Sequence, residues 1–287
     1  MQMQMFRPEE EVAGLAAYRP RATDIIISPY AKCGTTWLQQ TFHTLRTRGD
    51  MDFEDISAVV PWIETAVALG IDIDGPQRAG PRGFKSHLAF DRLPKGARYV
   101  VSFREPKDAL VSMYKFMEGW LAEPGAIPIS DLAGFWQFNP GQKPDYWRHL
   151  LTWWAERDNP DVLTLSYEYM IAHPKRTIEL LAEFSGIALD EELLDLTLKH
   201  SSIAFMLEHK PKFEDPGMRR LSEERCNIPA GGDSAKVRKG GSGGHRVELD
   251  DATIAAIDRV WTEVITPATG FATYADMNRE IERRLSR

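Results

Sequence analysis

The chain has 287 residues, of which 43% are hydrophobic and 27% are charged, so it is long and apolar enough to form a sizeable core. Its 35 basic and 42 acidic side chains give a net charge of -7, which argues against binding to nucleic acid through bulk positive charge. No apolar run approaches the roughly 18 residues of a membrane span, and the first residues lack the layout of a signal peptide. Two cysteines, Cys33 and Cys226, are too few for a disulfide framework and fit a reducing cytoplasm. We therefore expect one cytoplasmic domain over residues 1–287, with 1–22 as an N-terminal extension.

Three units of strand and helix follow one another along the chain. Each joins a short β-branched or apolar run to a segment with apolar residues at helical spacing: 24–28 with 35–49, 98–103 with the helix that begins near Pro106, and 161–168 with 173–186. A further helix is expected over 250–265. Because strand, loop and helix repeat in series, we expect an α/β fold in which helices flank a central parallel sheet.

Less regular segments lie between these units. Residues 70–83 and 119–145 are rich in glycine and proline, and residues 207–246 contain several prolines and the run GGSGG. Loops of this length inside a compact domain are usually lids or binding segments. We therefore expect a mobile loop or lid over 207–246.

The loop after the first strand, SPYAKCGTTW (28–37), has an unusual order of residues. Lys32 stands two residues before Gly34, whereas the pattern G-x-x-x-x-G-K-[ST] places the lysine directly after the last glycine. Backbone N–H groups and the hydroxyls of Thr35 and Thr36 can face an anion at the N-terminus of the following helix. The loop predicts a P-loop-like anion site that holds a different nucleotide.

Further cationic groups are expected at the same edge of the sheet, where strands end and helices begin and where ligands of such folds bind. Arg104 follows the second strand, and Ser112 lies about two turns into the next helix. The segment VRKGGSGG places Arg238 and Lys239 before a flexible glycine run. A ligand with two distinct anionic groups would use all of these elements.

Each feature also has a plainer explanation. The G-T-T sequence can be an ordinary helix cap, and Arg104 or the R-K-G run can be solvated surface groups. Cys33 could act as a nucleophile, because helix N-termini lower the pKa of a thiol. A phosphatase-like Cys-x5-Arg pattern would need arginine where the chain has Gln39, so we favour a small, structurally neutral cysteine.

The segment GFKSHL (83–88) supplies a candidate general base. Lys85 and His87 alternate along an extended segment and therefore point to the same side. An unperturbed pKa near 6.5 (roughly) lets a histidine take a proton at neutral pH. A histidine beside a lysine is by itself an ordinary polar residue, and the combination with the anion loop supports the assignment. No Asp, Glu and His residues have the spacing of metal ligands, so no metal is expected.

In combination the motifs resemble the cytosolic-type sulfotransferase family, which transfers a sulfuryl group from 3'-phosphoadenosine 5'-phosphosulfate (PAPS) to an acceptor hydroxyl. The family patterns and the segments that match them are Y-P-K-S-G-T-T-W with SPYAKCGTTW (28–37), K-T-H-L with KSHL (85–88), R-N-P-K-D-x-x-V-S-x-Y with REPKDALVSMYKF (104–116), YEDM with YEYM (167–170), H-T-S-F with HSSI (200–203), and RKG with RKG (238–240). Six matches in the same order are far more specific than any one of them.

The resemblance implies a role for each group of residues. The 5'-phosphosulfate would be held by Lys32, Cys33, Gly34, Thr35 and Thr36, the purine by Trp37, Tyr167, Ser201, Ser202 and Ile203, and the 3'-phosphate by Arg104, Ser112, Arg238, Lys239 and Gly240. Lys32 would neutralise the departing phosphate oxygen of the product, adenosine 3',5'-bisphosphate (PAP). His87 would deprotonate the acceptor hydroxyl, Lys85 would stabilise the transferring sulfuryl group, and Ser112 would contact Lys32 before the acceptor binds.

The chain departs from the family at several positions. Cys33 replaces a serine, and Ile203 replaces a phenylalanine and so removes an aromatic face from the purine site. Glu105 replaces an asparagine, and we expect its carboxylate to point away from the anion site. The family's G-D-W-K-N after R-K-G and its dimerisation pattern K-x-x-x-T-V-x-x-x-E are both absent, so no oligomeric state is carried over.

The acceptor site is the part that the motifs define least. Aromatic side chains in the flanking segments favour a small, flat, apolar alcohol or phenol: Trp62, Phe116, Trp120, Phe135, Trp136 and Phe138. Ordinary core packing explains any one of them equally well. An open, polar pocket around 119–145 would instead favour a sugar or glycolipid hydroxyl.

Two functions of other classes are less well supported. An ATP-dependent P-loop kinase would carry G-x-x-x-x-G-K-[ST] and a Walker-B aspartate, and neither is evident. A non-catalytic nucleotide-binding protein would not need Lys32, Lys85 and His87 together.

Overall fold

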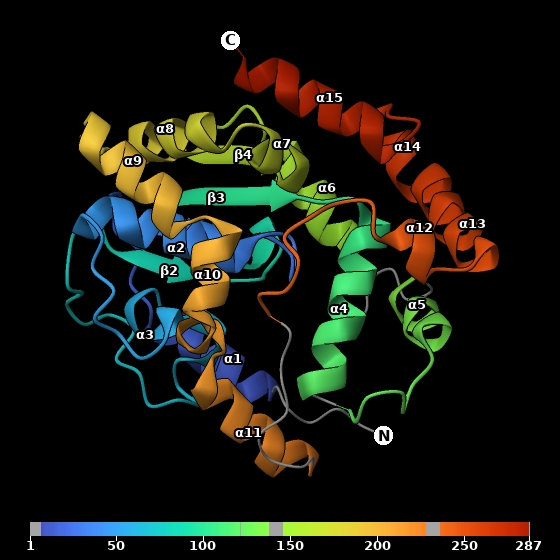
Figure 1. The fold of residues 1–287 in the computed structure, drawn as a ribbon, viewed down its shortest axis with the longest axis horizontal. Helices are drawn as coiled ribbons and strands as arrows, with labels where there is room; N and C mark the ends of the chain where they lie inside the picture. Colours follow the sequence, from blue (N-terminus) through green and yellow to red (C-terminus); the bar gives the residue numbers. More distant parts are fainter. Residues whose placement is uncertain (1–6, 121, 138–145, 228–235, 287) are drawn as a thin grey trace.

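A parallel sheet of four strands forms the centre of the computed structural model, which describes residues 7–120, 122–137, 146–227 and 236–286 (Figure 1). The strands are β1 (Ile25–Ile27), β2 (Gly83–Lys85), β3 (Arg98–Phe103) and β4 (Val162–Ser166), and they lie in the order β2-β1-β3-β4. Every neighbouring pair is parallel, with Ile26 aligned to Phe84 on one side and to Tyr99 on the other. The expected α/β fold with a parallel sheet is confirmed.

The rest of the described chain is mainly helical. The helices are α1 (Pro8–Ala17), α2 (Thr35–Thr47), α3 (Ile56–Val59), α4 (Pro106–Trp120), α5 (Ile129–Gln137), α6 (Tyr146–Ala155), α7 (Tyr167–Ala172), α8 (Pro174–Ser185), α9 (Glu191–His200), α10 (Ile203–Glu208), α11 (Pro216–Cys226), α12 (His245–Glu248), α13 (Asp251–Val260), α14 (Thr266–Thr269) and α15 (Tyr274–Leu285). Short 3-10 helices lie at η1 (Ile63–Thr65), η2 (Phe90–Arg92) and η3 (Lys210–Phe213), and a π-helical turn, η4 (Trp261–Ile265), continues α13.

The sheet separates two apolar cores. Successive strand residues face opposite sides, so Ile26 of β1 packs into one core while Ile25 and Ile27 pack into the other. The first core contains residues of α1, α4, α6, α13 and α15, and the second those of α2, α3, α8 and α9. Figure 1 shows α2, α8, α9 and α10 gathered on one side of the molecule and α4, α5, α12 and α13 on the other. With both faces covered, the ends of the strands remain as the place where polar loops can meet.

The expected strands and helices are confirmed except at some boundaries. Strand β4, which was expected over 161–168, ends at Ser166 rather than at Glu168. The Ser166 side chain accepts a hydrogen bond from Tyr169 N and so caps α7. Gly186, in the left-handed conformation, ends α8 as expected. The three tryptophans of α6, Trp147, Trp153 and Trp154, are buried in the first core.

The expectation of a long loop over 207–246 is wrong for most of the described part of that segment. It contains the end of α10, then η3, the eleven-residue α11 and the start of α12, and only 228–235 lie outside the described residues. Pro216 stands in the first turn of α11, where the missing N–H costs nothing, so this proline starts a helix rather than a loop. Within the expected N-terminal extension, α1 is tied to α11 by the ion pair of Glu10 with Arg225 at 2.7 Å.

Among the described residues, no helix is both long enough and apolar enough to span a membrane.

The close approach of β2 to α2 can be tested at Gly83. A Cβ at this position would lie 2.2 Å from Cε1 of Phe42, in a buried strand. We expect Gly83→Ala to lower the free energy of unfolding by about 1–3 kcal/mol, as overpacked cores do. Gly134→Ala is the matched control, because a Cβ there meets nothing within 4 Å. Urea denaturation that gave equal midpoints for the two variants would contradict this packing.

Candidate active site

The loop between β1 and α2 has the geometry of an anion-binding turn. Lys32 has φ 70 and Gly34 has φ 100, both in the left-handed region. A Cβ at Gly34 would lie 3.1 Å from the Tyr167 ring, so glycine is required by both the backbone and the space. This turn delivers the chain into α2 at Thr35, whose N-terminal N–H groups face the end of the sheet.

Arg104 connects this loop to the segment that follows the R-K-G run. Its Nη1 donates to Lys32 O at 2.8 Å and its Nη2 donates to Gly241 O at 2.9 Å. The guanidinium lies 4.2 Å from the centre of the Tyr167 ring and is 9% exposed as a residue. Its Nε and Thr35 Oγ1 are buried and have no hydrogen-bond partner among the described residues. Buried polar atoms are normally bonded, so these two fit a site that binds an anion.

Lys32 has an unusual electrostatic environment. Its ammonium lies 4.5 Å from the centre of the Phe116 ring. Loss of hydration, together with the positive charges of Lys236 and Arg104, lowers the pKa of Lys32 to about 7. An incoming anion would reverse this effect, so Lys32 is suited to a ligand that brings negative charge.

His87 is held in one orientation. Its Nδ1 donates to Pro29 O at 2.8 Å, and its ring packs edge-on against Trp62 with ring centres 5.1 Å apart. Burial, followed by the charge of Lys85, lowers the pKa of His87 to about 3. Because a carbonyl oxygen can only accept, the neutral ring carries its proton on Nδ1 and leaves Nε2 unprotonated. Lys85 Nζ lies 4.1 Å from the centre of the same Trp62 ring, which confirms that the two side chains share a side.

Glu64 supports this arrangement and was missed in the sequence. Its Oε1 accepts from His87 N at 2.8 Å and from the Ser86 hydroxyl at 3.0 Å, so it fixes the backbone beyond β2. Burial raises the pKa of Glu64 despite these donors. A glutamate within a short apolar run, PWIE, was the signal that could have drawn attention to it.

The glycine-rich run after Arg238 is fastened rather than free, which corrects the expected flexible run. Asp108, in the first turn of α4, accepts hydrogen bonds from Gly243 N, from His245 N at 3.0 Å and from the Ser242 hydroxyl at 2.9 Å. Burial alone would raise the pKa of Asp108, but these donors hold it below its ordinary range. Asp108 therefore places the loop beside Arg104.

The residues that the resemblance assigned to the purine and the 3'-phosphate lie around the same loop. Trp37 packs edge-on against Tyr167 at 5.9 Å between ring centres, and Ile203 packs directly against Gly240. Ser202 caps α10, Ser201 is buried, Arg238 is half-buried and Lys239 is exposed. The structure thus brings these residues near one another, while their contacts with a nucleotide stay a prediction.

Two departures from the family pattern are accommodated as expected. The Glu105 carboxylate accepts a hydrogen bond from Lys107 Nζ at 3.0 Å, so it is directed to that lysine. Cys33 is 1% exposed, and burial raises the pKa of its thiol to about 12. A thiol in this state is a poor nucleophile, so Cys33 is structural.

Two of the expected acceptor residues lie beside the catalytic candidates. Trp62 contacts Lys85 and His87, and Phe116 contacts Lys32. Ser112 lies one helical turn before Phe116 and so shares the face of α4 that meets Lys32. Phe138 and the side chains of Trp120, Phe135 and Trp136 lie outside the described residues.

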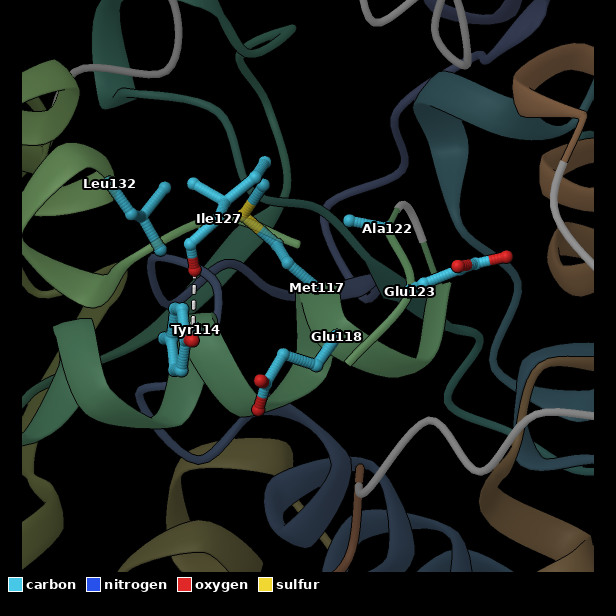
Figure 2. Close-up of a pocket in the computed structure, with 7 residues that line it drawn as sticks. All are labelled: Tyr114, Met117, Glu118, Ala122, Glu123, Ile127 and Leu132. Carbon is cyan, nitrogen blue, oxygen red and sulfur yellow. Dashed lines mark hydrogen bonds between the residues drawn. The ribbon is translucent and has the colours of Figure 1, made fainter. Parts of the chain in front are cut away.

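A small apolar pocket opens on another face of α4 (Figure 2). Met117, Ile127 and Leu132 form its apolar walls, and Tyr114 OH donates to Ile127 O at 2.9 Å. Tyr114 and Met117 are three residues apart and share a helix face that differs from the face of Phe116. This pocket is therefore separate from the Lys32 loop. No cluster of three His, Cys, Asp or Glu side chains in the described part of the chain could hold a metal ion.

Comparison with known proteins defines the family. The sulfotransferase domain matches residues 22–268. The chain is 29% identical to sulfotransferase 2A1 of Macaca fascicularis over 85% of this chain and 84% of that protein. It is 26% identical to the luciferin sulfotransferase of Photinus pyralis, over 92% of this chain and 76% of that protein.

Solved structures show the same fold. Mouse sulfotransferase SULT7A1 in complex with PAP superimposes with a TM-score of 0.69 at 19% identity, covering 96% of this chain and 94% of that one. Retinol dehydratase in complex with androsterone and PAP superimposes with a TM-score of 0.71 at 18% identity, covering 90% of this chain and 84% of that one. The domain match extends over most of the chain, so the protein belongs to the sulfotransferase family and is a sulfotransferase by class.

The thiol environment of Cys33 can be tested directly. Under native conditions we expect one equivalent of a thiol reagent such as DTNB to react quickly, at the half-buried Cys226, because the raised pKa and burial of Cys33 suppress its thiolate. Cys226→Ser should remove the fast phase, and denaturant should release Cys33. A fast phase that survives in Cys226→Ser would show that Cys33 is reactive.

Proposed function

We propose that this enzyme transfers the sulfuryl group of PAPS to the hydroxyl of a small, largely apolar alcohol or phenol. The observation that carries the proposal is His87, whose Nδ1 donates to Pro29 O and whose Nε2 is therefore unprotonated, beside Lys85 and at the end of the sheet where Arg104 bonds to the Lys32 loop. Cations stabilise the charge that develops in group transfer, and a base accepts the proton of the incoming hydroxyl. This combination is what sulfuryl transfer requires.

The donor fits the polar groups at this end of the sheet. The N–H groups at the start of α2 and the hydroxyls of Thr35 and Thr36 would hold the 5'-phosphosulfate, and unpartnered Thr35 Oγ1 suits that contact. Arg104, whose Nε is also unpartnered, would bind the 3'-phosphate with Arg238. The PAP bound in three structural neighbours supports this nucleotide.

The protein's part in the reaction is positioning and charge stabilisation. His87 Nε2 would take the acceptor proton, while the hydrogen bond from Nδ1 to Pro29 O holds the ring. Lys32 would meet the negative charge left on the phosphate oxygen as the S–O bond to phosphate breaks and the S–O bond to the acceptor forms. Lys85 would stabilise the oxygens of the sulfuryl group as it passes from the phosphate oxygen to the acceptor oxygen, as fixed cations do in related transfers.

An apolar acceptor is supported by the aromatic side chains next to these groups. Trp62 lies against His87 and Phe116 lies against Lys32, so an acceptor whose hydroxyl approaches Nε2 would come close to aromatic side chains. Two neighbouring structures hold androsterone or retinol together with PAP. Both are small, largely apolar molecules that carry a hydroxyl group, which agrees with an acceptor of this class.

The contact of Arg104 with the 3'-phosphate can be isolated by a matched pair of nucleotides. PAP and adenosine 5'-phosphate differ only in that phosphate. Titration calorimetry without metal should show that Arg104→Gln weakens the binding of PAP by about 10–100-fold, the loss expected for a charge-assisted contact. The binding of adenosine 5'-phosphate should weaken by much less. Equal losses for the two nucleotides would contradict the contact, and stronger binding of ATP with magnesium than of PAP by the wild type would contradict the proposed function.

The role of His87 as base is tested with His87→Gln, which keeps a polar side chain. We expect kcat to fall by about 10²–10⁴-fold, as for the loss of a general base. The dissociation constant of PAP should change by less than about threefold, since a base for the acceptor makes little contact with the nucleotide. A variant that loses PAP affinity while keeping kcat would show that His87 binds the donor instead.

A further inference from the structure

A buried carboxylate lies between two lysines beside the proposed sulfuryl site. Asp215 Oδ2 accepts a hydrogen bond from Lys85 Nζ at 3.2 Å and also pairs with Lys236 Nζ. The side chains of Asp215 and Lys85 are each 3% exposed, and that of Lys236 is 7% exposed. Neither Asp215 nor Lys236 was assigned a role from the sequence, although Lys236 stands two residues before Arg238.

Asp215 is held by groups other than the lysines. Its backbone N–H donates to Asp55 Oδ2 at 2.8 Å, and the Ser57 hydroxyl donates to its Oδ1. Asp55 also caps α3 by accepting from Ser57 N at 2.7 Å. With φ 48, Asp215 adopts a left-handed conformation that non-glycine residues rarely take and that its surroundings must enforce. Its position is therefore built into the joint between η3 and α11.

The charge of Lys236 reaches the groups of the proposed reaction. Burial is the largest cause of the lowered pKa of Lys32, Lys85 and His87, and the positive charge of Lys236 adds to each. The segment that begins at Lys236 crosses the end of the sheet beside α4 (Figure 1). Asp215 is the carboxylate that bonds to both lysines, and its single negative charge cannot neutralise both. A second buried carboxylate, Asp55, lies beside it and bonds to its backbone N–H.

We propose that Lys236 is a third lysine of the sulfuryl-transfer site and that Asp215 is its positioning residue. The carboxylate holds Lys85 and Lys236 together until the sulfuryl end of the donor replaces it as their partner. This inference rests on the proposed function, because it needs the donor at the Lys32 loop. Each ammonium has three N–H donors, which would bond to the sulfuryl oxygens. The exchange moves hydrogen bonds and makes or breaks no covalent bond.

The decisive comparison is between PAPS and PAP, which differ only in the sulfuryl group. Calorimetric titration should show that Lys236→Gln weakens the binding of PAPS about tenfold, the loss expected for a hydrogen bond to a charged group. The binding of PAP should weaken much less. Lys236→Arg keeps the charge and should retain most of the preference for PAPS. Arg220→Gln is the matched control, because it removes an exposed charge from α11 and should change neither affinity.

Asp215→Asn separates a positioning role from a merely structural one. We expect the free variant to melt at a lower temperature, because the buried Lys85 and Lys236 lose the carboxylate to which both bond. We expect it to bind PAPS more tightly than the wild type, because no carboxylate competes for the lysines. A merely structural ion pair predicts the opposite for binding, with PAPS and PAP both weakened.

Two outcomes would overturn this inference and leave the proposed function standing. One is an unchanged ratio of PAPS to PAP affinity in Lys236→Gln, whether both affinities stay the same or both fall by one factor. The other is weaker binding of PAPS by Asp215→Asn. A wild-type protein that binds neither nucleotide would instead overturn the proposed function, and the inference with it.

Discussion

Buried positive charge at the carboxyl end of the sheet is the constraint on which the rest of this structure depends. Lys32, Lys85 and Arg104 are crowded there, with Lys236 within electrostatic reach. Taking such charges out of water is costly unless anions or fixed dipoles compensate. Among the described residues, the buried carboxylate of Asp215 bonds to Lys85, and the backbone carbonyls of Lys32 and Gly241 accept from Arg104. The compensation is partial, which prepares the site for an anionic donor.

The surrounding fold keeps these groups in place from several directions. Asp108 binds the backbone at Gly243 and His245, so the segment after the R-K-G run is fixed to the start of α4. Glu64 fixes the backbone at His87, and Pro29 O, in the loop after β1, fixes the imidazole ring. The proton acceptor and the cations are therefore held by separate elements of the sheet edge. Such preorganisation is how enzymes stabilise developing charge without rearranging at the moment of reaction.

Much of the fold was predictable from the sequence because its signals are local. The strand runs, the glycine at 34 and the alternation of Lys85 with His87 all act within a few residues, and the structure confirms them. The pairing of Lys85 with Asp215 joins residues that are 130 positions apart, and no pattern of spacing reveals it. Helix α11 was missed because the prolines of the 207–246 segment were interpreted as signs of a loop, whereas Pro216 stands where a helix begins. Long-range contacts of charged side chains and the position of a proline were thus two sources of error.

The most direct test of the account is transfer itself. The purified enzyme would be incubated with radiolabelled PAPS, a chelator of divalent metals and a panel of apolar alcohols and phenols, with simple sugars as the contrast. We predict label in the sulfate ester of at least one apolar alcohol or phenol, with one PAP released for each ester and little label in the sugars. Label confined to sugars would contradict the proposed acceptor class. Binding of PAPS without any transfer across the panel would contradict the account of the site as a catalytic one.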